Sequence, residues 1–522
     1  MSVDSSAEIV RELSLTMPGR VSTSVPDRVA YARDLWPRGL IGVAEGVYAP
    51  QQPDAVVWPT STEEVAAIVA ACIRTKTPIV PYGAGSGVCG GTVAVAGGLI
   101  VDCKRMRRVV SIDAAAGSAT MEAGMIGEHL EHELNRRGLT MGHFPSSIMC
   151  STLGGWLAAR SAGQLSTRYG KIEDMVRSAT FVDGTAQIHE LVSGANPDLL
   201  QLAIGSEGTL GIFTRATVTV HPLPAARFYR GWSFPRVAAG CEAIRRVVQR
   251  GLRPACVRLY NELDSFLHRR DGKPEATHEA HRHADEPSAL GEWLTTLAGG
   301  KSAVSELRRR AVGAALGQPA FFNKLFSTVL PWAQNGCLLV MGFEGHSELA
   351  AAEAAAAKIE LERAGGKDLG PGPGERWLAH RYSVSFRMSK AFEAGAFVDT
   401  MEVCTTWDQL LPLYAAVQQA VGSHAFVMAH FSHAYPDGCS IYFTFAARAG
   451  GRVDTERRYD DLWKAALTAV HATGASISHH HGVGLLKAPF MPDEHGEGMR
   501  VYRGLKTALD PHFILNPGKM GL

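Results

Sequence analysis

The sequence predicts an α+β protein with two or more domains. The chain has 522 residues, which is more than one ordinary hydrophobic core supports. Hydrophobic residues make up 46% of the chain, so a sizeable core is available and global disorder is not expected. Strand-like and helix-like stretches alternate to about residue 222, and stretches that alternate like β-strands recur in the region that follows.

Composition and charge exclude several classes of function. Lys+Arg is 52 and Asp+Glu is 51, so the chain as a whole has no net positive charge large enough to attract nucleic acid. An anionic ligand would need a local cluster of basic residues. The 9 cysteines include no CxxC pair, so neither a disulfide framework nor a zinc finger is indicated. The acidic, amphipathic N-terminus is unlike a signal peptide, and no apolar run reaches the roughly 18 residues that span a bilayer. We therefore expect a cytoplasmic protein that would reach a membrane substrate from the surface.

The N-terminal part reads as a helical segment over residues 1–47 followed by alternating strands and helices. Thr60 or Ser61 can cap a helix that begins just after it, because acidic residues follow in the first turn. The further elements expected here are strands over 77–82 and 99–103, a glycine-rich loop over 83–91 between them, and a helix over 125–138 that ends at Gly138.

The sequence HPLP near residue 222 breaks this alternation, and a second region begins near residue 225. A polar stretch over 267–301 is typical of a loop, and an alanine-rich helix is expected over 350–364. The segments ACVRLY, FVDTMEV and CSIYFTF are expected as strands. The last part, from about residue 456, should contain a long helix, the segment SISHHHGVG and a final helix.

The glycine loop carries a literal GxGxxG match from Gly85 to Gly90. A Rossmann site needs a helix directly after these glycines, whereas here a strand is expected. The loop is therefore interpreted as a nest between strands, whose backbone N–H groups can cradle a pyrophosphate. A tight structural turn is the alternative for the loop taken alone.

Further segments make a resemblance specific. PYGAGS, STLGGW, YGKIEDMV and GSEGTLGI are similar, in order and spacing, to the FAD-binding domain of the vanillyl-alcohol-oxidase and alkyldihydroxyacetonephosphate-synthase group. The resemblance implies a PCMH-type FAD-binding domain of two subdomains and a cap or substrate domain with an antiparallel sheet. It implies four parts: an N-terminal segment 1–47, the FAD-binding domain 48–224, the cap 225–455, and a segment 456–522 that returns to the flavin.

The resemblance also implies which residues line the cofactor. They are Pro81, Tyr82, Gly83, Ala84, Gly85, Ser86 and Gly87; Ser146, Ser147, Ile148, Met149, Cys150, Ser151 and Thr152; Ala159, Arg160, Ser161 and Ala162; and Glu207, Gly208, Thr209, Leu210, Gly211, Ile212 and Phe213. Some relatives link FAD covalently through a histidine of the glycine loop. That loop has no histidine here, and Cys89 is its only cysteine, so non-covalent FAD is expected.

Three adjacent histidines, His479 to His481, precede flexible glycines near the C-terminus. Neighbouring side chains of a strand point to opposite faces, so regular structure cannot bring all three to one metal. A solvated loop or an accidental metal-binding tract is the alternative for this segment alone. No metal site is assigned, and the cluster HEAHRHAD over 278–285 is interpreted as a solvated loop.

Together, HHHGVG, GCSIYF and VRLY are similar to alkyldihydroxyacetonephosphate synthases, and the resemblance runs from about residue 25 to 522. It implies that Tyr442 is the catalytic acid/base, that His479, His480, His481 and Arg258 are needed for activity, and that His143 lies beside the flavin. Arg387 is the expected phosphate ligand of the substrate, with Arg381 as its rival. Taken singly, Arg258 and Tyr442 could be an ordinary ion-pairing residue and a core tyrosine.

The residue types suit the family's reaction, which exchanges the acyl chain of acyl-dihydroxyacetone phosphate for a fatty alcohol. Removal of a proton beside a ketone needs a base and a stabiliser for the developing enolate. Histidine titrates near neutrality, and neighbouring cations lower a tyrosine pKa. A guanidinium pairs well with phosphate oxygens. The flavin would act as a carrier rather than as a net redox centre.

The rival function is an FAD-dependent dehydrogenase of D-2-hydroxy acids such as D-lactate, D-2-hydroxyglutarate or glycolate. Such relatives typically show Glu-His-Gly where this chain has His480-His481-Gly482, and a histidine where it has Tyr442. Ser146 and the segment FVDTMEVCTTWD depart from the synthase pattern, which leaves the lipid substrate open. A flavin-storing or interaction protein would leave the histidine, tyrosine and arginine set without a role. We expect a small-molecule or lipid substrate, peripheral membrane contact and a homodimer, and no nucleic acid.

Overall fold

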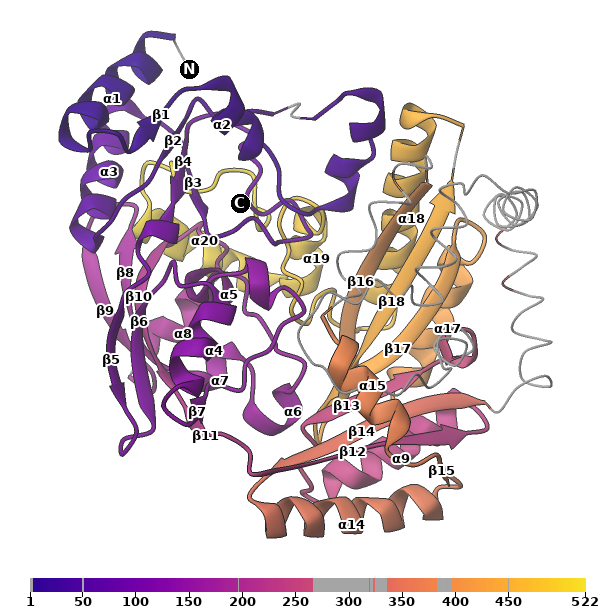
Figure 1. The fold of residues 1–522 in the computed structure, drawn as a ribbon. Helices are drawn as coiled ribbons and strands as arrows, with labels where there is room; N and C mark the ends of the chain where they lie inside the picture. The colour runs from indigo at the N-terminus through magenta and orange to yellow at the C-terminus, as the bar shows by residue number, and fades with distance from the viewer. Residues whose placement is uncertain are drawn as a thin grey trace, which may run out of the picture. The chain divides into compact units, whose positions relative to one another are not determined.

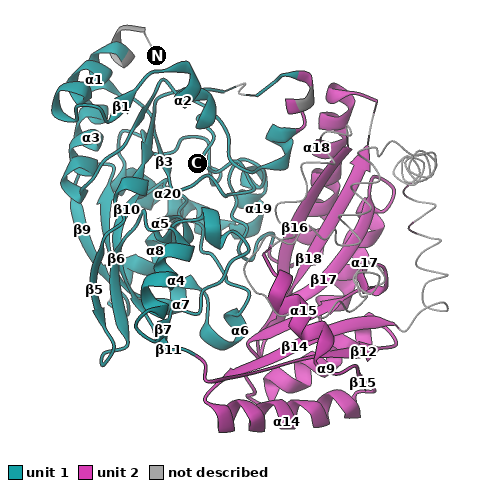
Figure 2. Cartoon of the chain, viewed as in Figure 1, with its two compact units in different colours: residues 1–40, 46–223, 477–522 teal, residues 41–45, 224–476 magenta. Residues whose placement is uncertain are grey.

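The computed structural model describes residues 3–48, 51–195, 197–265, 336–382, 396–448 and 450–522, together with Pro319, Asn323 and Phe392. The chain forms two compact units (Figure 2). Unit 1 contains residues 1–40, 46–223 and 477–522, and unit 2 contains residues 41–45 and 224–476. The units thus divide the chain mainly at 223/224 and 476/477, with residues 41–45 as a short further part of unit 2. The four-part functional division of the sequence stays a prediction.

Unit 1 contains two main sheets, drawn in indigo to magenta in Figure 1. The first has the order β1-β2-β4-β3, with β1 (Val21–Ser22) antiparallel to β2 (Ala55–Val57), and β4 (Leu99–Asp102) parallel to both β2 and β3 (Ile79–Tyr82). The second is antiparallel and has the order β5 (Val109–Asp113), β6 (Ser118–Glu122), β10 (Gly211–Thr219), β8 (Val176–Asp183) and β9 (Ile188–Val192). A small pair, β7 (Leu139–Thr140) and β11 (His221–Pro222), completes the unit's strands.

Helix α3 (Thr62–Thr75) joins the two sheets into one core. Ser61 is its N-cap, and the Ser61 side chain accepts a hydrogen bond from the Glu64 N–H, as the sequence predicts. Its buried residues, among them Ile68 and Val69, belong to one hydrophobic cluster with residues of the first sheet and with Val182 and Ile212 of the second. The burial of this apolar face stabilises the two-sheet arrangement.

The other helices of unit 1 are short or lie at its surface. They are α1 (Val3–Thr16), α2 (Val25–Ala30), α4 (Gly127–Asn135), α5 (Leu153–Ala158), α6 (Ser166–Tyr169), α7 (Ile172–Met175), α8 (Leu199–Ala203), α19 (Met491–His495) and α20 (Glu497–Leu509), with 3₁₀ turns at Pro37–Leu40, Cys103–Arg105, Ile148–Cys150 and Ala488–Phe490. The predicted helix over 125–138 is α4, and Gly138 adopts φ +72° in the turn that follows.

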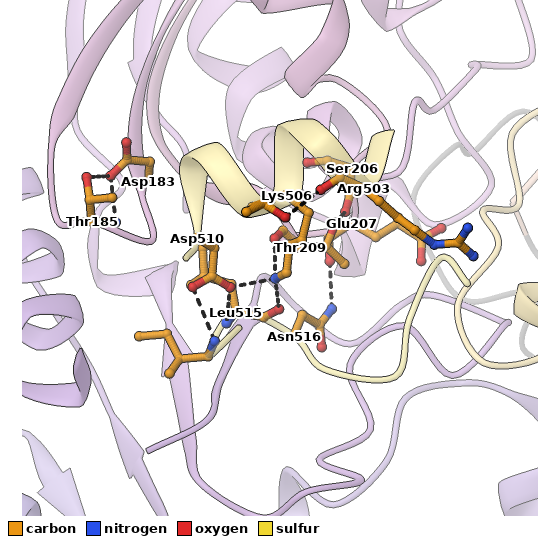
Figure 3. Close-up of polar contacts among 12 residues, drawn as sticks. Asp183, Thr185, Ser206, Glu207, Thr209, Arg503, Lys506, Asp510, Leu515 and Asn516 are labelled. Carbon is orange, nitrogen blue, oxygen red and sulfur yellow. Dashed lines mark hydrogen bonds and ion pairs between the residues drawn. The ribbon is translucent and has the colours of Figure 1, made fainter. Parts of the chain in front are cut away.

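The C-terminal tail runs beside β3. The Ile79 N–H donates to the Ile514 carbonyl at 2.7 Å, and the Asn516 N–H donates to the Ile79 carbonyl at 2.7 Å. The tail therefore covers the edge of the first sheet. Helix α20 is anchored through buried Lys506, whose Nζ donates to the Thr209 carbonyl at 2.7 Å and pairs with Asp510 at 2.5 Å (Figure 3).

Unit 2 is built on one antiparallel sheet of seven strands. Their order is β15 (Lys367–Asp368), β12 (Ala226–Phe234), β14 (Cys337–Gly345), β13 (Cys256–Tyr260), β17 (Phe426–Ala434), β18 (Gly438–Arg448) and β16 (Ala396–Thr406). Among the described residues, the helices of this unit are α9 (Val237–Gln249), α14 (Ser347–Arg363), α15 (Gly372–His380), α17 (Leu410–Val421) and α18 (Arg452–Ala472), with a 3₁₀ turn at Val43–Glu45.

The alternation of the strands separates the two faces of this sheet. One face carries fully buried apolar residues in register across four strands, namely Leu259, Phe431, Ile441 and Val403. The opposite face, which we call the polar face, carries polar side chains that belong to the candidate site described below. The strands predicted from ACVRLY, FVDTMEV and CSIYFTF are β13, β16 and β18, and the alanine-rich helix is α14.

Three further expectations concern the glycine loop, the polar stretch and membrane spans. Residues 83–98 connect two parallel strands without a helix, as the sequence analysis predicted. The polar stretch 267–301 lies outside the described residues. Within the described part of the chain, no helix has both the length and the apolar character required to cross a membrane.

Removal of the Asp510 carboxylate should destabilise unit 1, because Lys506 would keep a buried charge without its counter-ion. We predict that Asp510→Ala lowers the free energy of unfolding by about 3–5 kcal/mol. The control is Glu497→Ala on the same helix, where the pair with Arg500 is largely exposed and little change is expected. Urea denaturation would measure both, and equal effects would contradict the anchoring role of Asp510.

Candidate active site

The glycine loop presents main-chain amides in a row. Within the described structure, no hydrogen-bond acceptor is found for the N–H groups of residues 84–87. The carbonyls of Gly85 and Gly87 accept the Leu35 N–H at 3.1 and 2.9 Å, which holds the loop from the other side. Consecutive N–H groups of this kind form a concave site for an anion. The loop therefore fits a dinucleotide pyrophosphate.

The three glycine-bearing segments predicted to bind the cofactor contact one another. A Cβ at Gly83 would lie 2.4 Å from the Thr152 hydroxyl oxygen, and a Cβ at Gly208 would lie 2.7 Å from Pro81 Cγ. Thr152 is itself fixed, because its hydroxyl accepts the Gly155 N–H at the start of α5. Only glycine permits these close approaches. The residue types thus explain how segments distant in the sequence form one surface.

Several predicted cofactor residues direct their side chains elsewhere. The Arg160 guanidinium donates to the carbonyls of Gln201 and Ile204 at 2.8 and 2.9 Å. Tyr82 packs edge-on against Tyr31, with ring centroids 4.8 Å apart. The side chains of Ile212 and Phe213 are buried in the core. A cofactor role of these residues would therefore rest on their main chain or on packing.

The remaining predicted segment shows mostly internal hydrogen bonds. The Ser146 hydroxyl accepts from Gln164 at 3.0 Å, and the Ser151 hydroxyl accepts from the Trp156 indole at 2.8 Å. The 3₁₀ turn Ile148–Cys150 follows Ser147, and Met149 is exposed. These bonds hold the segment in a defined shape beside the glycine loop.

His143 is enclosed within unit 1. Its Nε2 lies 3.2 Å from the Ser161 hydroxyl, and its ring lies 4.6 Å from that of Trp156. Burial, with a smaller contribution from the charge of His480, lowers the pKa of His143 to about 3. The imidazole is therefore neutral near physiological pH, so it can donate or accept a hydrogen bond but carries no charge.

The three adjacent histidines belong to a loop of unit 1, residues 478–484, which we call the histidine loop. The Nδ1 atoms of His479 and His480 lie 3.1 Å apart, and the rings of His480 and His481 are nearly perpendicular. All three side chains are partly exposed. They therefore present neighbouring imidazoles at the surface of this unit and are not part of its core.

Tyr442 and Arg258 lie on the same face of the sheet in unit 2. Arg258 pairs with Ser432 and Tyr442 pairs with His430 in the register of neighbouring strands, so all four side chains project to the polar face. Burial raises the pKa of Tyr442 to about 12, while a hydrogen bond with Thr400 and the charge of Arg258 oppose the rise. Tyr442 is therefore a neutral phenol near pH 7.

His430 stacks on Tyr442. The two rings are nearly parallel, with centroids 4.6 Å apart. His430 Nδ1 also lies 3.6 Å from a carboxylate oxygen of Asp264. Both residues are at most 8% exposed. His430 thus contacts both the Tyr442 ring and the Asp264 carboxylate.

A β-bulge adds a second histidine to this face. The register shifts between Ser432 and Ala434, and His433 adopts φ +49°, which is uncommon for a residue other than glycine. The bulge brings His433 Nε2 to 3.7 Å from the carboxylate of buried Glu402. Glu402 also accepts a hydrogen bond from the Ser440 hydroxyl at 3.0 Å.

The structure describes only one of the two candidate phosphate ligands. Arg387 lies outside the described residues. Arg381 follows α15 and stacks over the Tyr382 ring at 4.7 Å. Its charge acts on Cys256, which is two residues from Arg258 on the same face of β13. Of the two arginines, Arg381 is the one that the described structure associates with the polar face.

Sequence reasoning missed His430, His433, Glu402 and Asp264. The two histidines stand three positions apart, which on a regular strand would place them on opposite faces. Only the bulge brings His433 to the polar face. The presence of two histidines within an otherwise buried strand was the one signal available in the sequence.

Comparison with known proteins covers nearly the whole chain. Residues 53–191 match the FAD binding domain family, and residues 223–520 match the family described as FAD linked oxidases, C-terminal domain. This chain belongs to the FAD-linked oxidase family. The match confirms FAD as the cofactor and the predicted α+β, PCMH-type fold.

Within this family, the protein is alkyldihydroxyacetonephosphate synthase-like. It is 31% identical to an alkyldihydroxyacetonephosphate synthase of Dictyostelium discoideum, over 98% of this chain and 80% of that protein. A solved alkyldihydroxyacetonephosphate synthase is similar with a TM-score of 0.74 and 28% identity, over 98% of this chain and 84% of that one. A D-lactate dehydrogenase of Anaerostipes hadrus is 26% identical over 91% of this chain and 90% of that protein.

The close approach of Gly83 to Thr152 gives a test of FAD binding in this FAD-linked oxidase. We predict that Gly83→Ala lowers FAD occupancy at least tenfold, because the new Cβ would displace the loop from Thr152. Occupancy is measured from the flavin absorbance, and acid precipitation should release FAD from the unaltered protein. Gly504→Ala is the control, since its Cβ would meet no atom within 4 Å. Unchanged occupancy in Gly83→Ala would show that the loop does not bind FAD.

The neutral state of His143 makes stability depend on pH. The folded pKa of about 3 lies below the ordinary value of 6.5, so the unfolded chain binds the extra proton first. Stability should therefore be lost as pH falls from about 6.5 toward 3, by up to about 1.4 kcal/mol per pH unit from this residue. Urea denaturation of His143→Gln should show a correspondingly smaller loss. If the unaltered protein and His143→Gln lost the same free energy of unfolding as the pH falls, His143 would not be buried in its neutral form.

Proposed function

We propose that this FAD-dependent enzyme exchanges the acyl chain of an acyl-dihydroxyacetone phosphate for a long-chain alcohol. The observation that carries the proposal is the polar face of unit 2. There, β17 carries His430 in register with Tyr442 of β18 on one side, and Ser432 in register with Arg258 of β13 on the other. The similarity to alkyldihydroxyacetonephosphate synthases over nearly the whole chain supports it. The glycine loop and the segments 146–152, 159–162 and 207–213 would hold FAD, which supplies an electron-accepting ring when bound.

The reaction has no net oxidation. The bond between carbon 1 of the dihydroxyacetone phosphate and the acyl oxygen breaks, and the fatty acid leaves as a carboxylate. The alcohol oxygen then bonds to the same carbon and loses its proton. A proton on that carbon is exchanged in the course of the reaction. The residues must therefore move protons, bind the phosphate and exclude water.

Tyr442 is the group that we propose to move the proton at carbon. Because its pKa is about 12, it needs neighbouring groups that stabilise the phenolate when it acts as a base. Arg258 supplies a fixed positive charge, and His430 supplies an imidazole stacked on the phenol. The imidazoles of His479, His480 and His481 each have nitrogens that can donate or accept a proton. We propose that these groups serve one reaction.

The phosphate of the substrate needs a guanidinium, whose planar donors pair with its oxygens. Arg381 and Arg387 are the candidates that we propose. We also propose that FAD is bound without a covalent link. Cys89, the only cysteine of the glycine loop, directs its thiol to the carbonyls of His481 and Gly482 at 3.4 and 3.6 Å. Homodimer formation and peripheral membrane contact stay proposals.

A dehydrogenase of D-2-hydroxy acids is the second candidate function. The similarity to the D-lactate dehydrogenase of Anaerostipes hadrus favours it. Tyr442 and the sequence His480-His481-Gly482 oppose it, because a metal-dependent site would be expected to retain a carboxylate and an imidazole there. The two candidates differ in electron flow, since only the dehydrogenase would reduce an electron acceptor.

Purified protein incubated with palmitoyl-dihydroxyacetone phosphate and hexadecanol should release palmitate and form the ether product in equal amounts. A panel of D-lactate, D-2-hydroxyglutarate and glycolate with a reducible dye should give no turnover. Dye reduction by a hydroxy acid, without ether product, would defeat the proposal and establish the second candidate.

Loss of the proton-transfer groups should lower turnover and leave the flavin in place. We predict that Tyr442→Phe and His480→Ala each reduce kcat by roughly 10²- to 10⁴-fold while FAD absorbance is unchanged. Tyr414→Phe is the matched control, because Tyr414 is another buried tyrosine of unit 2, hydrogen-bonded to Asn261 and Gln418. Loss of FAD from either variant would show that the residue is structural.

A further inference from the structure

The Glu207 side chain is directed toward the histidine loop. We propose that Glu207 is a positioning residue, which holds the histidine loop in place against the glycine loop. The sequence analysis placed Glu207 among the cofactor-lining residues, and the geometry gives its carboxylate a different partner. The kinetic part of this inference rests on the proposed function, whereas the structural part does not.

The carboxylate receives two main-chain hydrogen bonds from the histidine loop. The Val483 N–H donates to Glu207 Oε1 at 2.5 Å, and the Gly484 N–H donates to Oε2 at 2.8 Å. Only Gly482 separates these two consecutive amides from the three histidines. Hydrogen bonds to an ionised acceptor are about twice as strong as neutral ones. One side chain thus fixes the main chain at the end of the histidine run.

The shape of the loop is adapted to this carboxylate. A Cβ at Gly482 would lie 2.6 Å from Glu207 Oε1, and Gly482 has φ +81°, a conformation that favours glycine. The pairing with Glu207 therefore requires glycine at the position directly after His481. Any side chain here would have to displace the carboxylate or the loop.

The Glu207 main chain is also held firmly. Glu207 has φ +49°, and its N–H donates to the Ala158 carbonyl at 2.9 Å. The Asn516 side-chain amide donates to the Glu207 carbonyl at 2.6 Å and to the Gly91 carbonyl at 2.9 Å (Figure 3). The C-terminal tail thus ties the base of Glu207 to the glycine loop, so the carboxylate projects from a fixed point.

Two buried lysines act on the charge of the Glu207 carboxylate. Burial raises the pKa of Glu207, and the two loop amides together with Lys487 and Lys519 oppose the rise. Lys519 is held just after the glycine loop, because its Nζ donates to the Val93 carbonyl at 2.8 Å. Asp34 is the other carboxylate near this cluster. The cations and the two N–H groups thus favour the carboxylate form against the larger effect of burial.

A second set of contacts joins the histidine loop and its C-terminal flank to the glycine loop. The Leu485 and Leu486 N–H groups both donate to the Cys89 carbonyl, at 2.9 and 3.2 Å. The hydrogen bonds to Cys89 fix the chain after Gly484, and those to Glu207 fix Val483 and Gly484. The side chains of His479 to His481 are partly exposed. Removal of the Glu207 carboxylate would therefore free the Val483 and Gly484 amides beside the histidines and leave the flank attached to Cys89. Catalytic groups lose activity when their supporting residues allow even small displacements.

The test uses the FAD-loaded protein and compares Glu207→Ala and Glu207→Gln with Glu131→Gln. Glu131 is a matched buried acid of unit 1, which accepts the Met141 N–H and the Thr140 hydroxyl and has no role in the site. Hydrogen–deuterium exchange of the peptide that contains residues 479–487 should become roughly 10- to 100-fold faster in Glu207→Ala. Glu207→Gln, which can accept only one of the two N–H groups, should be intermediate, and Glu131→Gln should match the unaltered protein.

Kinetics separate a positioning role from a cofactor role. In Glu207→Ala, kcat should fall roughly 100-fold, with KM within about twofold and FAD occupancy unchanged. Gly482→Ala, which disturbs the same contact from the loop side, should reproduce both the faster exchange and the lower kcat. This second variant keeps the test decisive if Glu207→Ala does not fold.

The outcomes distinguish this inference from the proposed function. Unchanged exchange in all Glu207 and Gly482 variants would overturn the positioning role, and so would selective loss of FAD from Glu207→Ala. Faster exchange in a protein that makes no ether product even when unaltered would support the positioning role and defeat the proposed function.

Discussion

The arrangement of unit 1 depends on the main-chain hydrogen bonds between Ile79 and the C-terminal tail. Strand β3 leads directly into the glycine loop, so a tail paired with β3 is delivered to that loop. The same pairing places the side chains of Asn516 and Lys519 beside the glycine loop, where they bond to Gly91 and Val93. A contact between residues about 435 positions apart therefore brings the C-terminal tail to the glycine loop.

Unit 2 obeys a different constraint, which is the two-residue period of its strands. One face of the sheet must be apolar because it is fully buried, so the polar residues of the same strands gather on the other face. Tyr442, His430 and Arg258 are brought together in this way by register alone. The bulge at His433 is the single departure from the period among these residues, and it adds an imidazole near Glu402. Bulges are often found where a side chain must be redirected at a functional site.

Local patterns in the sequence were sufficient for much of the fold. The glycine loop between two strands, the helix that Ser61 caps and the strands that carry Arg258 and Tyr442 are all set by short-range preferences. The partners of these elements were not predictable, because the register of β13 with β17 and of β17 with β18 depends on contacts far apart in the sequence. His430, His433 and Glu402 were missed for this reason. The contact of Glu207 with Val483 was missed likewise, since it joins positions 276 residues apart.

The proposed reaction exchanges the oxygen substituent at one carbon of the substrate, with no net transfer of electrons. The most direct measurement is the fate of oxygen-18 in the alcohol. The holoenzyme would be incubated without oxygen with palmitoyl-dihydroxyacetone phosphate and oxygen-18-labelled hexadecanol, and the products analysed by mass spectrometry. The account predicts that the ether oxygen retains the label and that the released palmitate carries none. An unlabelled ether, a labelled palmitate or the absence of any ether would contradict it.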